Sequence, residues 1–373
     1  MKLTERIKNW LTKERVIYSE PWYTGYGQGN DLSDVTLYVC LKTLSESVAK
    51  LPVYIQDADY NRLKNLKLAF LLGFAPNKRQ TASEFFTFIE FCRSYYGNGY
   101  AYIHWDDDGE IEEIVPLDPR KMLIWVSGDD YYYQYDSGPL IDKGDVIHVK
   151  SWLTDGYVGK PVKDILAELV TGNKAGSEFQ TDLYKSGLQA NVVVKYVGDL
   201  NSKEQQAMLR QIKAVSSRAN GRILPIPKGW DVTPLDIKLT DQQFLETRKY
   251  TALQLAAAFG IKPNYLNDYS KSSYANSASQ NLSFYTDTLL YILSVYEQEL
   301  TRKLLTETQI RQGLEIKFNY SVILRADPQQ QAEILAKYVG GSIYKINEAR
   351  QKAGLPPVEG GDSIVMASGY SKA

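Results

Sequence analysis

Cysteine and histidine are scarce in this sequence, and their scarcity excludes several kinds of site. The 373 residues include two cysteines and two histidines. Cys40 and Cys92 lie in apolar helical patterns without metal spacing, so we expect buried thiols of a reducing compartment. His104 and His148 lie on predicted strands, with no cysteine or serine in a nucleophile context. The sequence therefore predicts no catalytic residues, no metal site and no cofactor, and we expect the protein not to be an enzyme.

Net charge and long apolar runs are also lacking. The formal net charge is −1, so the chain as a whole is not a basic nucleic-acid-binding surface, and any contact with DNA would be local. No apolar run approaches the ~20 residues that cross a bilayer. The first ten residues lack the apolar region of a secretory signal. We therefore expect a soluble, non-secreted protein with no membrane partner.

Nucleotide-binding loops are missing as well. The run from Gly156 to Pro161 fails the phosphate-binding pattern in its length and its last residue. Gly25, Gly27 and Gly29 form a glycine-rich stretch that follows no strand and opens no helix, so we interpret it as part of an N-terminal arm. An ATPase or a dinucleotide-dependent enzyme is poorly supported.

The most informative stretch of the chain runs from Leu239 to Leu305. A helix is predicted from Thr240 to Phe259 and a longer one from Ser277 onwards, each opened by a Ser or Thr with a Gln three residues later. Between them lies a polar segment, 267–276, with no apolar face to bury. The apolar positions of the longer helix recur at spacings of three and four and predict one buried stripe: Leu282, Tyr285, Leu289, Ile292, Tyr296, Leu300 and Leu304.

Two further helices are predicted near the start, one from Leu32 capped by Ser33 and one capped by Ser83. Alternating apolar residues predict a mainly antiparallel β region, and Asp106–Asp108 are interpreted as a solvated hairpin turn rather than a metal site. The predicted strands are 53–55, 100–105, 110–115, 122–126, 131–135, 146–150 and 314–318, with 191–197, 222–226 and 230–234 in a later insert.

A small αβ insert, 188–237, lies between two predicted long helices, 161–186 and 240–259. The ends of an insert must lie close together, so we expect these helices to run antiparallel. The first would be a single rod on the order of 40 Å long, with Pro161 in its first turn. Gly172 and Gly176 inside it suggest a close helix–helix approach.

Several blocks resemble, in order, those of phage portal proteins of the HK97 type. The long helix opens with Tyr274-Ala-Asn-Ser-Ala-Ser-Gln280 and closes with Glu297-Gln-Glu-Leu-Thr-Arg-Lys-Leu-Leu305; Ser277–Ser279 and Thr301 depart from the family pattern. The other blocks are Ser47–Pro52, Gly97–Tyr102, Pro116–Pro119, His148 with Asp155–Gly159, Arg325–Pro328, Ile346–Arg350 and Gly354–Val358.

The resemblance implies a portal-like α+β fold with an α/β wing, two long antiparallel stem helices, a small αβ clip and a long helix leading to a C-terminal helical crown. The implied divisions are an N-terminal arm (1–31), wing (32–156), first stem helix (157–187), clip (188–237), second stem helix (238–262), tunnel loop (263–281), long wing helix and strand (282–318) and crown (319–373).

The resemblance implies a protein that is not an enzyme and that forms a ring at one capsid vertex of the virion. Double-stranded DNA would be packaged through this ring and later ejected through it. The implied partners are eleven further copies in a dodecamer, the terminase large subunit, a head–tail adaptor, and the major capsid and scaffold proteins, with assembly in the host cytoplasm. We expect the tunnel loop to face DNA through Lys271, Ser272, Ser273, Tyr274 and Asn276. We expect terminase or adaptor to dock on clip residues Lys203, Arg210, Lys213 and Arg218.

Two alternatives belong to other classes. A metal-dependent nucleic-acid-processing enzyme would need clustered carboxylates, whereas the acidic residues of this sequence are scattered. A capsid structural protein without a channel would not form a closed ring.

Overall fold

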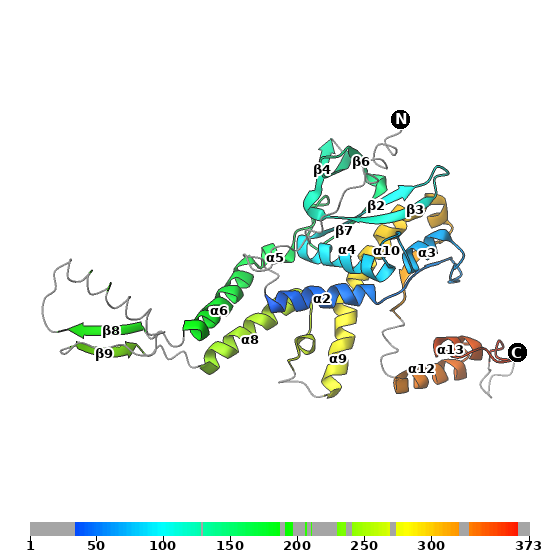
Figure 1. Ribbon diagram of the computed structural model, residues 1–373. Coiled ribbons are helices and arrows are strands. Elements are labelled where there is room, and N and C mark those ends of the chain that lie inside the picture. The colour runs from blue at the N-terminus through cyan, green and yellow to red at the C-terminus, as the bar shows by residue number, and fades with distance from the viewer. Residues whose placement is uncertain are drawn as a thin grey trace.

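The structure, a computed structural model, describes residues 34–127, 130–186, 191–196, 206, 210, 230–235, 241–268, 274–320 and 328–364. It is a mixed α+β fold in which a body of sheets and helices carries two long helices that leave it on one side (Figure 1). The helices are α2 (Val35–Ala49), α3 (Lys67–Gly73), α4 (Ala82–Tyr96), α5 (Val162–Ile165), α6 (Ala167–Ser186), α8 (Asp241–Ala258), α9 (Tyr274–Phe284), α10 (Leu290–Leu304), α11 (Glu307–Arg311), α12 (Pro328–Gly340) and α13 (Ile346–Lys352).

All sheets of the described residues are antiparallel and small. Their strand orders are β3-β2-β7, β4-β5-β6, β1-β10 and β8-β9. The strands are β1 (Val53–Gln56), β2 (Asn98–Trp105), β3 (Ile111–Leu117), β4 (Met122–Ser127), β5 (Asp130–Tyr135), β6 (Leu140–Asp142), β7 (Val146–Lys150), β8 (Asn191–Tyr196), β9 (Trp230–Leu235) and β10 (Glu315–Phe318). The strands expected from the sequence are present except for 222–226, which lies outside the described residues, and β6 is an addition.

The main core lies where α2, α4 and α10 pack together over the sheets. Apolar side chains such as Leu41, Phe86, Tyr296 and Phe318 are almost fully buried there. A second, smaller cluster around Tyr133 joins the two three-stranded sheets. Cys40 and Cys92, the two cysteines of the chain, are free and buried, as expected.

The two N-caps predicted in the first third of the chain differ from those observed: the first was placed one residue too early and the second two residues too late. Asp34, not Ser33, precedes α2 and accepts a hydrogen bond from the N–H of Leu37 at 2.9 Å. Thr81, not Ser83, precedes α4 and forms a capping box with Glu84. In both places more than one residue of a capping type stands near the start of the helix, so the sequence alone does not select the cap.

The long predicted rod after Pro161 is broken in two. α5 ends at Ile165, and Leu166 leaves the helical backbone region (φ −104°, ψ 20°) before α6 begins. Val162, Leu166 and Leu169 all pack against the main core, so the break lies where the chain leaves the body. No described atom lies within 4 Å of a Cβ built at Gly172 or Gly176, so close packing within the chain does not explain these glycines.

The helix after the polar segment also differs from its prediction. It begins at Tyr274 rather than Ser277, and a π-helical turn, η5 (Tyr285–Leu289), separates α9 from α10. The extra residue in a π-turn rotates the preceding helix out of phase. Leu282 is therefore 54% exposed instead of buried, and Phe284, five residues before Leu289, is buried in its place.

Candidate functional site

The long helices join the body at a junction that contains several hydrogen bonds between distant segments. On the incoming side, the amide of Asn98 pairs with the backbone of Gly159 in both directions: its Oδ1 accepts from the N–H at 2.7 Å, and its Nδ2 donates to the carbonyl at 2.8 Å. A Cβ atom at Gly97 or Gly159 would overlap the carbonyl of the other. The sequence blocks around Gly97 and Gly159 are thus two halves of one contact, which fixes the chain just before α5.

His148 completes this contact from β7. Its Nε2 lies 2.9 Å from Oδ1 of Asn98, which can only accept, so Nε2 carries the proton and Nδ1 accepts from the hydroxyl of Tyr133 at 2.9 Å. Burial, together with Lys150, Lys303 and Arg302, holds the pKa of His148 well below its usual value. His148 is therefore a neutral structural residue, and His104 makes a ring contact with Tyr102.

On the outgoing side, Gly260 ends α8 with φ of +72°, a value that favours glycine. The hydroxyl of Thr288, in the π-turn, donates to the carbonyl of Gly260 at 2.9 Å, and a side chain at Gly260 would overlap Thr288. The end of α8 is therefore in direct contact with the π-turn.

The segment after Gly260 is bound along its length to α9 and the π-turn. Lys262 pairs with Asp287 at 3.2 Å, and Asn264 contacts both Asn281 (2.6 Å) and Gln280 (3.3 Å). Hydrogen bonds from Ser283 and Thr286, and then from Lys262, lower the pKa of Asp287. The last described residue before the polar segment, Asp268, pairs with Lys249 of α8 at 3.0 Å.

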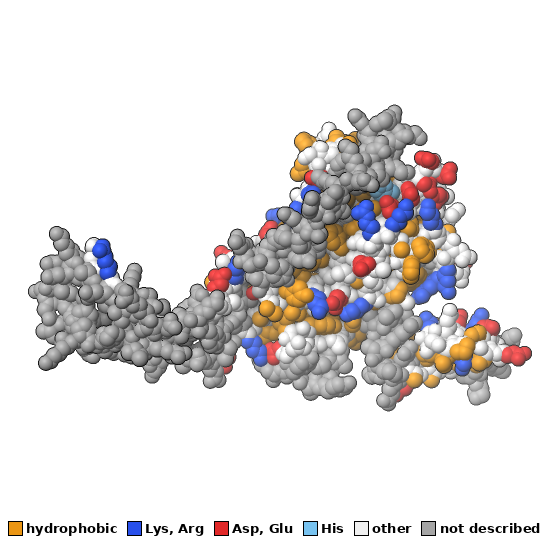
Figure 2. All heavy atoms as spheres, viewed as in Figure 1, with side chains coloured by type: hydrophobic (Ala, Val, Ile, Leu, Met, Phe, Trp, Pro, Cys, Tyr) orange, Lys and Arg blue, Asp and Glu red, His pale blue; other side chains and the backbone are white. Residues whose placement is uncertain are grey.

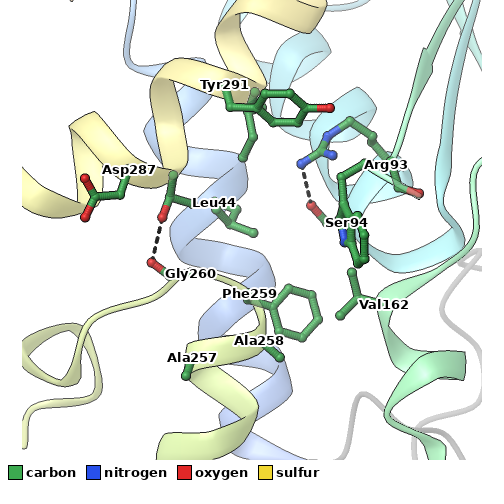
Figure 3. A pocket seen from close by; sticks show the side chains of 14 residues that line it. Leu44, Arg93, Ser94, Val162, Ala257, Ala258, Phe259, Gly260, Asp287 and Tyr291 are labelled. Carbon is green, nitrogen blue, oxygen red and sulfur yellow. Dashed lines mark hydrogen bonds between the residues drawn. The ribbon is translucent and has the colours of Figure 1, made fainter. Parts of the chain in front are cut away.

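A cavity of about 290 Å³ opens between these two connections. Its walls come from α2, α4, the chain before α6, the end of α8 and the helix after the π-turn (Figure 3). Most of the lining is apolar, and the guanidinium of Arg93 reaches its wall from α4. Arg93 is paired with the fully buried carboxylate of Glu90 through two contacts of 2.7 Å. Burial alone would lower the pKa of Arg93, but Glu90 raises it above its usual value.

Polar side chains near the end of α10, in the block 297–305, bind the backbones of strands from two sheets; this set of hydrogen bonds is called the bracket. Glu297 accepts from the backbone N–H of Phe318 at 2.9 Å, and Glu299 accepts from that of His148 at 3.1 Å. Thr301 accepts from the N–H of Ile316 at 3.2 Å. The sequence analysis did not predict these roles, because helical periodicity does not indicate which strand a polar side chain will contact.

Most of the residues expected to contact DNA or partners lie outside the part of the chain that the structure describes. Lys271, Ser272, Ser273, Lys203, Lys213 and Arg218 lie outside the described residues. The backbones of Tyr274 and Asn276 form the first turn of α9 rather than a loop, and Arg210 is helical and exposed. Their roles stay predictions.

Within the described residues, no group of three or more His, Cys, Asp and Glu side chains is arranged to hold a metal ion. Asp106 instead closes its hairpin by accepting from the N–H groups of Asp108 and Glu110. In the same part of the chain, no helix has the length and apolar character needed to cross a membrane.

Comparison with known proteins gives a consistent result. The family model described as "Phage portal protein" matches residues 35–354. The portal protein of Enterobacteria phage HK97 is 25% identical over 390 residues, covering 98% of this chain and 92% of that protein.

Solved structures agree with respect to the fold. An HK97 family phage portal protein from Corynebacterium diphtheriae matches with a TM-score of 0.63 at 14% identity, over 80% of this chain and 96% of that one. A chain in the neck of a native gene transfer agent particle, computed with C12 symmetry, matches with a TM-score of 0.58 at 21% identity, over 96% and 100% of the two chains.

Proposed function

The chain belongs to the phage portal protein family, and from this premise we propose that it forms the ring-shaped channel at one vertex of a capsid. Double-stranded DNA would enter this channel during packaging and leave through it during ejection. Portal proteins are structural components of the virion and not enzymes, so the chemistry required of the chain is binding, assembly and passage.

The paired connection of the long helices carries the proposal. α6 leaves the body beyond Gly159, α8 returns to it at Gly260, and the two helices pack against each other. Beyond their far ends, β8 and β9 pair antiparallel from Asn191 with Leu235 to Tyr196 with Trp230 (Figure 1). A pair of packed helices with a small sheet at its tip fits the stem and clip of a portal, while the body fits the wing and α12–α13 fit the crown.

The DNA-facing element is then the polar segment between α8 and α9. It carries one acidic and one basic residue, Asp268 and Lys271, among Tyr, Ser and Asn. Each Lys or Arg contact to phosphate adds salt-dependent affinity, so a lining with little net charge lets DNA slide. Asp268 is held by Lys249, which leaves Lys271 as the charge nearest to the DNA in this proposal.

The partners follow from the proposed position in the virion. We place the clip helix carrying Lys203, Arg210, Lys213 and Arg218 against terminase during packaging and against the head–tail adaptor afterwards. The relative in the neck computed with C12 symmetry supports a dodecamer. The wing would meet the capsid and scaffold proteins.

Negative-stain imaging with mass measurement of the purified protein tests the proposal. Closed rings with a central hole wide enough for duplex DNA are expected. If the protein assembles only as open or solid particles, with scaffold protein present or absent, the channel is excluded. A magnesium-dependent nuclease activity in the same sample would favour the enzyme alternative.

A further inference from the structure

The cavity at the base of the long helices has the composition of a protein-binding pocket. Its rim carries Trp152 and Tyr291, which are 60% and 56% exposed, and its wall carries Arg93. Trp, Tyr and Arg are the residue types that dominate binding energy at protein interfaces. At about 290 Å³, the cavity is close to the lower end of the usual size of binding pockets, about 300 Å³.

Arg93 also offers a hydrogen-bond donor that the described residues do not use. Its Nε and Nη2 donate to Glu90, and Nη2 also contacts Ser94 at 3.4 Å. No described residue accepts from Nη1, although the Arg93 residue is only 7% exposed. An occupant of the cavity that brings an oxygen acceptor beside an apolar group could accept a charge-assisted hydrogen bond from this nitrogen.

A matching protrusion stands elsewhere on the same chain. Tyr60 is 80% exposed, more than any other large apolar side chain of the described residues. It is held with φ of +62°, rare for a side chain of this size, in a tight turn where Oδ1 of Asp57 accepts from the N–H groups of Asp59 and Asn61, each at 2.9 Å. The carboxylate of Asp59, next to Tyr60, has no partner among the described residues. The turn thus presents an aromatic ring and a free carboxylate together.

We propose that Tyr60 of one copy inserts into the cavity of the next copy in the ring, with Asp59 accepting a hydrogen bond from Nη1 of Arg93. None of the residues 57–61 lines the cavity, whose walls include Leu44 of α2 and Val162 of α5 (Figure 3). We therefore place the contact between copies. A closed ring requires two different, complementary surfaces on each copy, and the turn and the cavity supply one such pair. This inference rests on the proposed ring.

Photo-crosslinking at Ala258 tests the contact directly. Ala258 lines the cavity mouth and is exposed, so a benzoylphenylalanine placed there does not disturb the core. Irradiated rings are expected to give covalent dimers of this chain whose crosslinked peptide contains residues 57–61. The matched control is the same group at Ala332, an exposed position on α12. Rings that crosslink elsewhere, or not at all, from Ala258 overturn the docking contact alone, whereas absence of rings from the unmodified protein overturns the proposed function.

Truncating the protrusion gives an independent measurement. Tyr60→Ala is expected to raise the protomer concentration for half-maximal ring assembly by a factor of about ten or more, the usual effect of losing an anchor residue. Tyr60→Phe keeps the aromatic side chain, so this variant should assemble normally. Phe74→Ala removes another exposed aromatic, 67% accessible, outside the contact and should also assemble normally. Unchanged assembly of Tyr60→Ala would contradict the proposal.

Discussion

The carboxylate of Glu297, on α10, accepts a hydrogen bond from the backbone N–H of Phe318, on β10, at 2.9 Å. The same carboxylate accepts from Lys317 at 3.3 Å and from the hydroxyl of Tyr320 at 3.1 Å. One side chain thus ties the long helix to the strand that pairs with β1. Its neighbour Glu299 does the same for β7.

Glu297→Ala should lower the free energy of unfolding by about 1–3 kcal/mol, because it leaves a buried N–H without an acceptor. Urea denaturation followed by circular dichroism measures this change. Glu307→Ala is the matched control: Glu307 is also in a helix and paired with Arg311, but both are about 80% exposed (79% and 78%), and its loss should change stability by less than about 0.5 kcal/mol. Equal effects would refute the bracket.

Two glycine-to-alanine substitutions should act in opposite directions. At Gly159 the added methyl meets the carbonyl of Gly97 and the N–H of Ser151, so the chain before α5 must move and the protein should be strongly destabilised. At Gly172, in α6, it meets no described atom and should stabilise the helix by about 1 kcal/mol. Thermal unfolding of both variants is the measurement, and a stable Gly159→Ala protein would contradict the junction.

Stability should depend on pH through His148. Its pKa in the folded protein lies well below the usual 6.5, so below pH 6.5 the unfolded chain binds a proton that the folded chain does not. Stability is therefore complete above pH 6.5 and falls as pH decreases, by up to about 1.4 kcal/mol per pH unit, until the folded pKa is reached. Urea denaturation at pH 7.0, 6.0 and 5.5 should show this slope. His148→Gln should flatten it, and an unchanged slope would assign the proton to another group.

Thr288→Val should loosen the end of α8. The substitution keeps the shape of the side chain but removes the hydrogen bond to Gly260, at a cost of about 1 kcal/mol. Amide hydrogen exchange should accelerate in residues 261–268 while that of the β3-β2-β7 sheet stays slow. Thr87→Val, which removes an exposed bond to Ser83 within α4, is the control and should leave residues 261–268 unchanged.

Reversing the four basic clip residues, Lys203, Arg210, Lys213 and Arg218, to Glu should abolish DNA packaging while rings still form. Repulsion at a docking surface prevents binding without affecting contacts elsewhere. Packaging assays with terminase, alongside imaging of rings, measure both properties. Reversal of Lys50 and Arg311, two exposed basic residues of the body, serves as the control. Normal packaging by the fourfold variant would exclude this face as the docking site.

Local patterns predicted most of the elements of this fold, because alternation and helical spacing are properties of a few neighbouring residues. They failed where the outcome depends on distant contacts. The π-turn, which exposes Leu282 and buries Phe284, contains Thr288, which bonds to the distant Gly260. The pairing of β1 with β10, and the roles of Glu297 and Asn98, join segments far apart in the sequence.

On the surface, too, the sequence predicts overall properties but not the arrangement of individual residues. Seen from one side, charged side chains of both signs are scattered over the body among apolar ones (Figure 2), as the net charge of −1 leads one to expect. The net charge does not reveal that Asp59 and Tyr60 lie together on one exposed turn. The positive φ of Tyr60 occurs in a turn with local hydrogen bonds to Asp57, which the composition of the chain does not describe.

The pairing of β1 with β10 also has a consequence for synthesis on the ribosome. Gln56 faces Glu315, 259 residues later. At about 5–20 residues per second, β1 waits on the order of 10 to 50 s for its partner strand. Both long helices and the segment between them are synthesised during that interval, while the edge of β1 is open to pairing with other nascent chains. A host chaperone that shields this edge would therefore act before any ring can begin to form.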